Sequence, residues 1–186
     1  MSDRSFRGLF FALALAGLLL DQTSKYLIFA WLDNTPYPVV ADMFNLEARH
    51  ETNDPASRPL VNQGALFGFL RNHGTLANGL FAAVSIAAAV AIVFWATLRS
   101  TSRDWSLSAS LGLILAGTLG NLYDRIVFGG VRDFLHFYYR SFDWPVFNVA
   151  DVCLVLGAIL LLTQALFSRA PAESQMLEIR QPVEVK

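Results

Sequence analysis

Residues 117–151 read GTLGNLYDRIVFGGVRDFLHFYYRSFDWPVFNVAD and connect the end of one apolar segment to the start of another. The stretch contains Asp124, Asp133 and Asp151 among its carboxylates, together with Arg125. Charged side chains near a bilayer are costly, so they normally pair with one another or take part in chemistry. The stretch therefore predicts a membrane fold and a candidate active site.

The composition also indicates a membrane protein. The chain is 54% hydrophobic and only 16% charged, whereas about a quarter of the residues in a soluble domain are charged. The net charge of −1 gives no electrostatic basis for binding nucleic acid. Cys153 is the single cysteine and the three histidines lack the spacing of metal ligands, so we expect no disulfide, metal or cofactor.

Four apolar segments are each long enough to cross a bilayer as a helix, which takes about 20 residues. We expect these helices over residues 7–31, 76–98, 107–128 and 147–167. Lipid permits only helices and closed barrels, and these runs are too long and continuous for barrel strands. A soluble four-helix bundle is the alternative, but the second and fourth segments have no polar face. The predicted fold is therefore an all-α membrane protein with four transmembrane helices.

The first segment could instead be a cleaved signal peptide. Arg4 and Arg7 precede it, and residues 14–16 resemble a cleavage site, as in a secretory signal. The apolar character continues beyond that site and resumes up to Trp31. We therefore expect this segment to be a retained helix.

The arginines predict the orientation. Arg99 and Arg103 lie in the short link between the second and third segments, and the positive-inside rule places that link and both termini in the cytoplasm. We then expect residues 33–75 to face outward, with short strands near the start of this segment. We expect one domain over residues 1–170 and a flexible cytoplasmic tail over residues 171–186.

The third apolar segment carries a polar face. Asn121 and Asp124 are three residues apart and share one side of a helix. In the first segment, Asp21 and Lys25 are four residues apart and can pair. A polar face does not point at lipid, so we expect Asp124 and Arg125 to pair with Lys25 and Asp21 in a buried structural network.

Asp133 and Asp151 are predicted to meet at the outward-facing surface of the membrane that the helices cross. Asp133 follows a Gly-Gly break, and Asp151 lies at the start of the last helix, three residues after Asn148. Taken alone, Asn148 could be an N-cap and Asp151 an acid favoured by the helix dipole. Two facing carboxylates, however, share one proton. One can then activate water while the other polarises a scissile carbonyl, as in aspartic peptidases.

Other functions are less well supported by the sequence. It contains no G-x-S-x-G, H-E-x-x-H or Walker motif for a different catalytic apparatus. A small transporter or channel that uses the intramembrane Asp, Lys and Arg residues is the main alternative, but such proteins often contain internal repeats, and none is evident. A purely structural membrane protein would not need two carboxylates at adjacent helix ends.

Five motifs, in this order, resemble those of lipoprotein signal peptidase, also called signal peptidase II, an aspartic peptidase of the bacterial inner membrane. They are D-x-x-[ST]-K at 21–25, N-x-G-[AV] at 62–65, G-x-x-G-N-x-x-D-R at 117–125, V-x-D-[FY] at 131–134 and F-N-x-A-D at 147–151. The resemblance implies that Asp133 and Asp151 form the catalytic pair. It implies that the residues lining or bracing the substrate site are Asn62, Gly64, Asn121, Arg125 and Asn148.

The resemblance also implies a fold detail, a substrate and an inhibitor. Residues 37–75 would supply a small extracytoplasmic β-cradle and a short periplasmic amphipathic helix. The substrates would be diacylglyceryl-modified prolipoproteins, cut just before the lipid-modified Cys at the outer face of the inner membrane and in contact with membrane lipids. Globomycin would inhibit the enzyme. One departure from the family pattern is the segment between Leu46 and Asn62, which resembles an insertion in the cradle.

Overall fold

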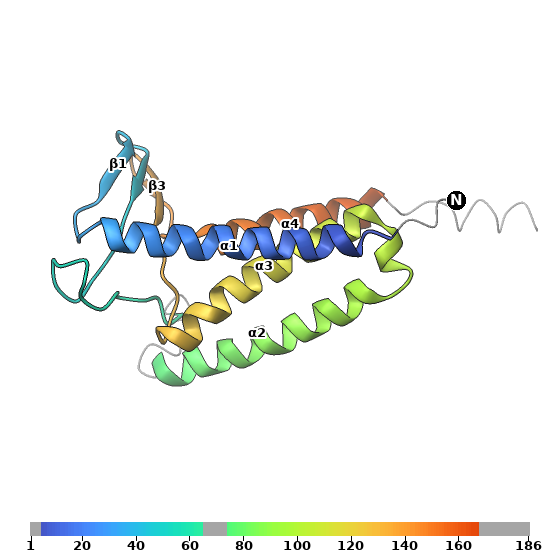
Figure 1. Ribbon diagram of the computed structural model, residues 1–186. Helices are drawn as coiled ribbons and strands as arrows, with labels where there is room; N and C mark the ends of the chain where they lie inside the picture. Colours follow the sequence, from blue (N-terminus) through green and yellow to red (C-terminus); the bar gives the residue numbers. More distant parts are fainter. Residues whose placement is uncertain (1–4, 65–73, 168–186) are drawn as a thin grey trace, which may run out of the picture.

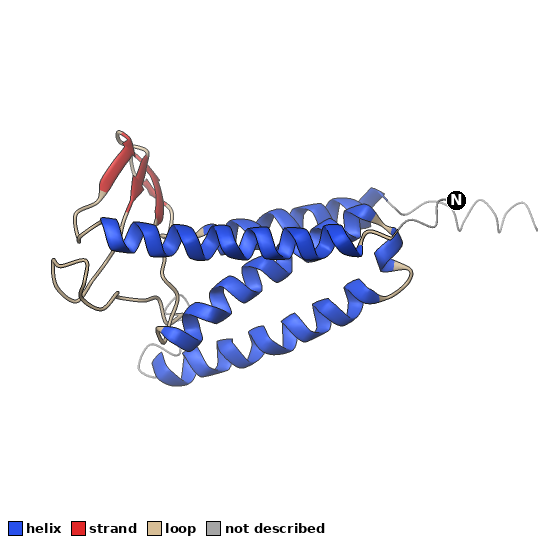
Figure 2. Cartoon of the chain, viewed as in Figure 1, coloured by secondary structure: helices blue, strands red, loops and turns tan. Residues whose placement is uncertain are grey.

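The computed structural model of the protein describes residues 5–64 and 74–167. Within these residues, four long helices form an elongated bundle, with a small sheet at one end and the start of α1 at the other (Figures 1 and 2). The helices are α1 (Arg7–Trp31), α2 (Gly74–Thr97), α3 (Trp105–Val127) and α4 (Val149–Phe167), with a 3-10 turn, η2 (Thr101–Arg103), before α3. The predicted bounds agree with these to within two residues.

Helix α3 is the centre of the bundle, because it packs against α1, α2 and α4. Its small residues allow this approach. A Cβ atom on Gly120 would lie 2.5 Å from Asp21 Oδ2 and 3.1 Å from Ala150 Cβ. Asp104 caps the start of α3 by accepting hydrogen bonds from the backbone N–H groups of Ser106 and Leu107.

Three of the helices are long and apolar enough to cross a membrane, namely Thr75–Thr97, Trp105–Val127 and Val149–Phe167. Helix α1 is not among them, because the polar run Asp21–Lys25 lowers its mean hydropathy. The expected fourth span therefore remains a prediction. Most of α2 is exposed in the isolated chain, as expected for a helix that faces lipid on most sides.

The sheet is antiparallel, in the order β1 (Tyr37–Val40), β2 (Phe44–Leu46), β3 (Leu135–Tyr139) and β4 (Phe142–Asp143). Residues 37–75 supply β1 and β2, as predicted, but β3 and β4 come from the loop between α3 and α4, which the prediction missed. Strand β2 pairs with β3 through Phe44–Phe137, Asn45–His136 and Leu46–Leu135. This long-range pairing links the segment between α1 and α2 to the loop between α3 and α4.

Two predicted features fall partly or wholly outside the described residues. No helix occurs between β2 and residue 64 in the structure, and residues 65–73, the rest of the segment expected to hold an amphipathic helix, lie outside the described residues. The predicted tail at 171–186 lies outside them too.

The apolar core has two parts. One cluster lies toward the N-terminal end of α1 and contains Phe10, Ala14, Ala96, Leu111 and Leu115. The other lies beneath the sheet and contains Phe29, Leu32, Ala48 and Phe134. The second cluster joins the end of α1 to the strands, so the sheet is fixed to the bundle beside the candidate site.

Candidate active site

Asn148 links the two predicted catalytic carboxylates. Its Nδ2 atom donates to Asp133 Oδ1 at 2.7 Å. Its backbone N–H donates to Asp151 Oδ2, and the Asp151 N–H donates back to Asn148 Oδ1, both at 3.1 Å. This reciprocal pair has the form of a capping box at the start of α4. Asn148 therefore caps α4, as its residue type and position predict, and it also bridges the two carboxylates; its role in the substrate site stays a prediction.

The second carboxylate is held by α3. Asn121 Nδ2 donates to Asp151 Oδ1 at 2.8 Å. The Asn121 Oδ1 atom accepts from Lys25 Nζ and from Asn148 Nδ2, both at 3.2 Å. Because Lys25 can only donate, it orients the Asn121 amide with its NH₂ group toward Asp151.

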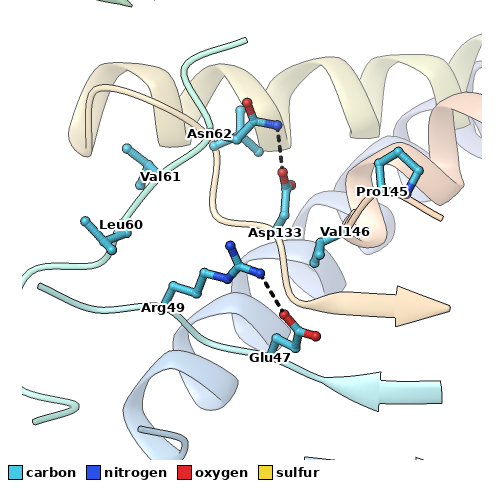
Figure 3. A pocket seen from close by; sticks show the side chains of 9 residues that line it. Glu47, Arg49, Leu60, Val61, Asn62, Asp133, Pro145 and Val146 are labelled. Carbon is cyan, nitrogen blue, oxygen red and sulfur yellow. Dashed lines mark hydrogen bonds and ion pairs between the residues drawn. The ribbon is translucent and has the colours of Figure 1, made fainter. Parts of the chain in front are cut away.

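The first carboxylate is held from the opposite side by the segment after β2. Asn62 and Val131 exchange backbone hydrogen bonds at 2.8 and 2.9 Å. Asn62 Nδ2 donates to Asp133 Oδ2 at 3.0 Å (Figure 3). Asn62 Oδ1 accepts from the N–H of Gly64 at 2.9 Å. Gly64 has φ of 92°, a backbone conformation that favours glycine.

Burial sets the protonation of Asp133. Loss of solvent raises its pKa, and the nearby Asp151 charge raises it further, to about 6. Hydrogen bonds from Asn62 and Asn148 and the charge of Lys25 oppose this rise. A carboxyl group with such a pKa can hold a proton at mildly acidic pH, which general acid catalysis requires.

The structural network is confirmed in part. Lys25 Nζ lies 2.9 Å from Asp21 Oδ2 and 3.3 Å from Asp124 Oδ2, and all three side chains are fully buried. The expected pairing of Arg125 with Asp21 was wrong. Arg125 lies on the flank of α3 that faces α2, where its guanidinium packs over the Phe81 ring and Nη1 donates to the Asn121 carbonyl at 3.2 Å.

Arg132 is the partner of Asp124 that sequence reasoning missed. Its Nη2 atom lies 2.9 Å from Asp124 Oδ1, and its backbone N–H donates to Asp124 Oδ2 at 2.9 Å. The guanidinium also packs between the rings of Tyr26 and Phe128, 4.4 and 4.0 Å from their centroids. The neighbouring Asp133 was a signal, because alternation along an extended segment places adjacent side chains on opposite faces.

A cavity of about 500 Å³ opens beside Asp133. Its lining residues are Glu47, Arg49, Leu60, Val61, Asn62, Val131, Asp133, Pro145 and Val146 (Figure 3). A second cavity of about 460 Å³ lies against α4 and is mainly apolar. Its lining includes Asp151, Trp144, Val152, Val155 and Leu156. Each carboxylate of the pair thus borders a different cavity.

Among the described residues, no group of three or more His, Cys, Asp and Glu side chains could hold a metal ion. The functional groups gathered at this site include carboxylates, amides, the Lys25 ammonium and guanidinium groups. Such a set can move a proton to and from a water molecule and polarise a carbonyl group.

Comparison with known proteins shows which family this chain is similar to. A family model described as Signal peptidase (SPase) II matches residues 13–167. The lipoprotein signal peptidase of Dichelobacter nodosus is 39% identical over 163 residues, covering 88% of this chain and 97% of that protein. The lipoprotein signal peptidase of Cellvibrio japonicus is 38% identical over 144 residues, covering 77% of this chain and 78% of that protein.

The fold has solved counterparts. A bacterial membrane enzyme determined by the in meso method at 1.9 Å resolution superposes with a TM-score of 0.74 and 26% identity, covering 91% of this chain and 99% of that chain. A second, determined at 2.3 Å, has a TM-score of 0.72 and 24% identity. The named relatives are peptidases, so the comparisons do not support the alternative of a transporter or channel.

Proposed function

The chain belongs to the signal peptidase II family and removes signal peptides from prolipoproteins, and from this premise we propose that it is an aspartic endopeptidase whose catalytic pair is Asp133 and Asp151. The observation that carries the proposal is the position of Asn148, which hydrogen-bonds both carboxylates. The two carboxylates are joined through one amide and each lines a cavity, and an aspartic peptidase works with such a pair of Asp residues.

The reaction divides the work between the two carboxylates. Asp151 accepts two hydrogen bonds, from Asn121 Nδ2 and from the Asn148 backbone N–H, which hold its carboxylate beside the cavity along α4. It takes a proton from the attacking water. Asp133 carries the other proton and donates a hydrogen bond to the scissile carbonyl. Water oxygen bonds to the carbonyl carbon, the carbon–nitrogen bond then breaks, and the leaving nitrogen receives a proton from the pair.

The substrate is a prolipoprotein whose Cys carries diacylglycerol, and cleavage occurs just before that Cys. An acylated substrate stays in the bilayer, so the cleavage site must lie at the membrane surface. Support comes from the apolar cavity along α4, which reaches Asp151. Globomycin is expected to inhibit the enzyme by competing for this site, and membrane lipids surround it.

We place the protein in the bacterial inner membrane, with α1 as a fourth span. The polar run of α1 does not exclude this, because Asp21 and Lys25 are fully buried against α3, leaving the outer face of α1 apolar. Both termini are then cytoplasmic, and the sheet and carboxylate pair lie on the periplasmic side. The bundle and sheet act as one peptidase domain over residues 1–170, followed by a cytoplasmic tail.

The test is a cleavage assay with purified protein in detergent and a diacylglyceryl-prolipoprotein, followed by gel shift. Wild type converts the substrate to the shorter form, and Asp133→Asn and Asp151→Asn do not. Circular dichroism and gel filtration establish that the variants are folded. Normal cleavage by either folded variant would remove that carboxylate from the catalytic pair.

A further inference from the structure

The hairpin formed by residues 47–62 makes one wall of the cavity beside Asp133. It joins β2 to the segment that holds Asn62, and His50 pairs with Pro59 across it. Asn34 at the end of α1 fixes the hairpin, since its side chain accepts from the His50 N–H at 2.6 Å and donates to the His50 and Thr52 carbonyls, both at 3.2 Å. The wall is therefore held in place by the bundle.

Arg49 is the cation in this wall. It lines the same cavity as Asp133, and its side chain reaches from the hairpin toward Asp133 and Glu47 (Figure 3). Arg49 Nη2 lies 3.3 Å from Glu47 Oε2, and 71% of the Arg49 side chain is exposed. A guanidinium has five N–H donors, so the contact with Glu47 uses one of them on a side chain that lines the cavity.

The negative charge of Glu47 is not paired with Arg49 alone. Its other oxygen, Oε1, lies 2.5 Å from His136 Nδ1, and His136 Nε2 lies 2.6 Å from Asp143 Oδ1. Although burial lowers the pKa of His136, the hydrogen bonds to Asp143 and Glu47 outweigh that effect and raise it. Both oxygens of Glu47 are thus engaged, one by His136 and one by Arg49, so Glu47 does not occupy the whole guanidinium of Arg49.

The two cavities indicate which part of a substrate passes Arg49. The apolar cavity runs along the exposed side of α4 and borders Asp151, whereas the cavity with Arg49 lies on the side of the sheet and borders Asp133. An apolar signal segment stays with the helices in the bilayer. The chain on the other side of the scissile bond, which starts with the Cys and is polar, must leave past the sheet.

We propose that Arg49 is a specificity-determining residue that binds an acidic side chain within the first few residues after the lipid-modified Cys of the substrate. This inference rests on the proposed function, because it assigns part of the same site. A carboxylate suits the fork of a guanidinium, which binds it through two N–H groups. The residue contacts the substrate beside the scissile bond and takes no part in proton transfer.

The experiment compares diacylglyceryl-prolipoproteins that are identical except for Asp, Asn or Lys at the second, third or fourth residue of the mature chain. For at least one position, wild type should cleave the Asp substrate more efficiently than the Lys substrate, with a kcat/KM ratio of about threefold or more. Arg49→Glu should reverse that ratio and Arg49→Gln should bring it close to one. The wild-type preference should shrink at 0.5 M salt, because the contact is exposed.

Arg58 provides the matched control. It lies on the same hairpin but lines a neighbouring cavity with Val127 and Phe128, and not the cavity beside Asp133. Arg58→Glu should leave the ratio at its wild-type value. An unchanged ratio in Arg49→Glu, or an equal reversal in Arg58→Glu, would overturn the role of Arg49. Absence of cleavage of every substrate by wild type would instead overturn the proposed function, and this inference with it.

Discussion

Asn148 Nδ2 lies 2.7 Å from Asp133 Oδ1, so the residue that caps α4 also positions a carboxylate 15 residues earlier in the chain. The same side chain receives the Asp151 N–H. Helix formation and the geometry of the candidate catalytic pair therefore depend on one side chain.

Substitutions at Asn148 should separate its role in capping α4 from its role in positioning Asp133. Serine can still cap a helix but is too short to reach Asp133, so Asn148→Ser should keep its melting temperature while kcat falls about tenfold to a hundredfold through loss of orientation. Asn148→Ala should lose the same activity and also about 0.5–2 kcal/mol of stability with the cap. Thermal unfolding and cleavage kinetics measure both. A fully active Asn148→Ser enzyme would contradict this positioning role.

The pH dependence of kcat/KM should report the protonation of Asp133. Its pKa is raised to about 6 and the proposed reaction uses the protonated group, so kcat/KM should fall as pH rises through about 6. The hydrogen bond from Asn62 favours the ionised form, so its removal in Asn62→Ala should raise the pKa and move the descending limb to higher pH. The measurement is kcat/KM between about pH 4.5 and 8.5. If kcat/KM of Asn62→Ala falls at the same pH as in wild type, or at a lower pH, the assignment of this fall to Asp133 is contradicted.

The same shift predicts a stability effect. The pKa of Asp133 is higher in the folded protein than its ordinary 3.8, so its contribution to stability is fully present below about pH 4 and is lost as pH rises through about 6. At pH 8 Asp133→Asn should therefore be more stable than wild type, by on the order of 2 kcal/mol. Thermal unfolding at pH 8 and pH 4 measures the difference, which should vanish at the lower pH. The exposed Glu51→Gln is the control and should show no such dependence.

Much of the fold and site could be predicted from local patterns. Long apolar runs determine helices because lipid leaves the backbone no other way to satisfy its hydrogen bonds. The carboxylates Asp133 and Asp151 could be singled out because each lies next to a helix end. The role of Asn148 as an N-cap followed from its residue type and its position before α4.

The parts that could not be predicted depend on long-range contacts. Strand β3 pairs with β2 across about 90 residues of chain, and short strands carry no signal for the partner they choose. Alternation along the extended segment could place Arg132 on the face opposite Asp133, but the sequence could not name Asp124 as its partner. Its burial between two rings and Asp124 arises only when the end of α3 packs beside α1.

Asp124 is predicted to act in folding and not in catalysis. It faces Lys25 Nζ at 3.3 Å and the Arg132 guanidinium at 2.9 Å. Asp124→Asn would leave these buried cations with less compensating charge, and loss of one partner of a buried pair costs about 3–5 kcal/mol. Yield and melting temperature should fall sharply, while the protein that does fold retains cleavage. Asp143→Asn, at an exposed site, should change stability little. Normal yield and melting of Asp124→Asn would contradict the structural role.

The tip of the hairpin is predicted to be dispensable. The backbone N–H of Glu51 donates to the Arg58 carbonyl at 2.9 Å, so these two residues already form the last pair before the tip. Two paired residues can be joined by an Asn-Gly turn. Replacement of residues 52–57 by Asn-Gly should therefore keep the base of the hairpin, including Arg49 and Leu60, in place. Cleavage of a diacylglyceryl-prolipoprotein should stay within about threefold of wild type, because the tip lines neither cavity that borders the carboxylate pair.

A second deletion tests whether the base of the hairpin is the part that matters. Removal of residues 48–60 would take away Arg49 and Leu60, two of the residues that line the cavity beside Asp133, and also the Asn34 contacts to His50. This variant should lose most of its cleavage activity, while the Asn-Gly variant keeps it. If the Asn-Gly variant folds with the wild-type melting temperature and yet cleaves nothing, the tip itself must contact the substrate, and the boundary of the site has to be extended to residues 52–57.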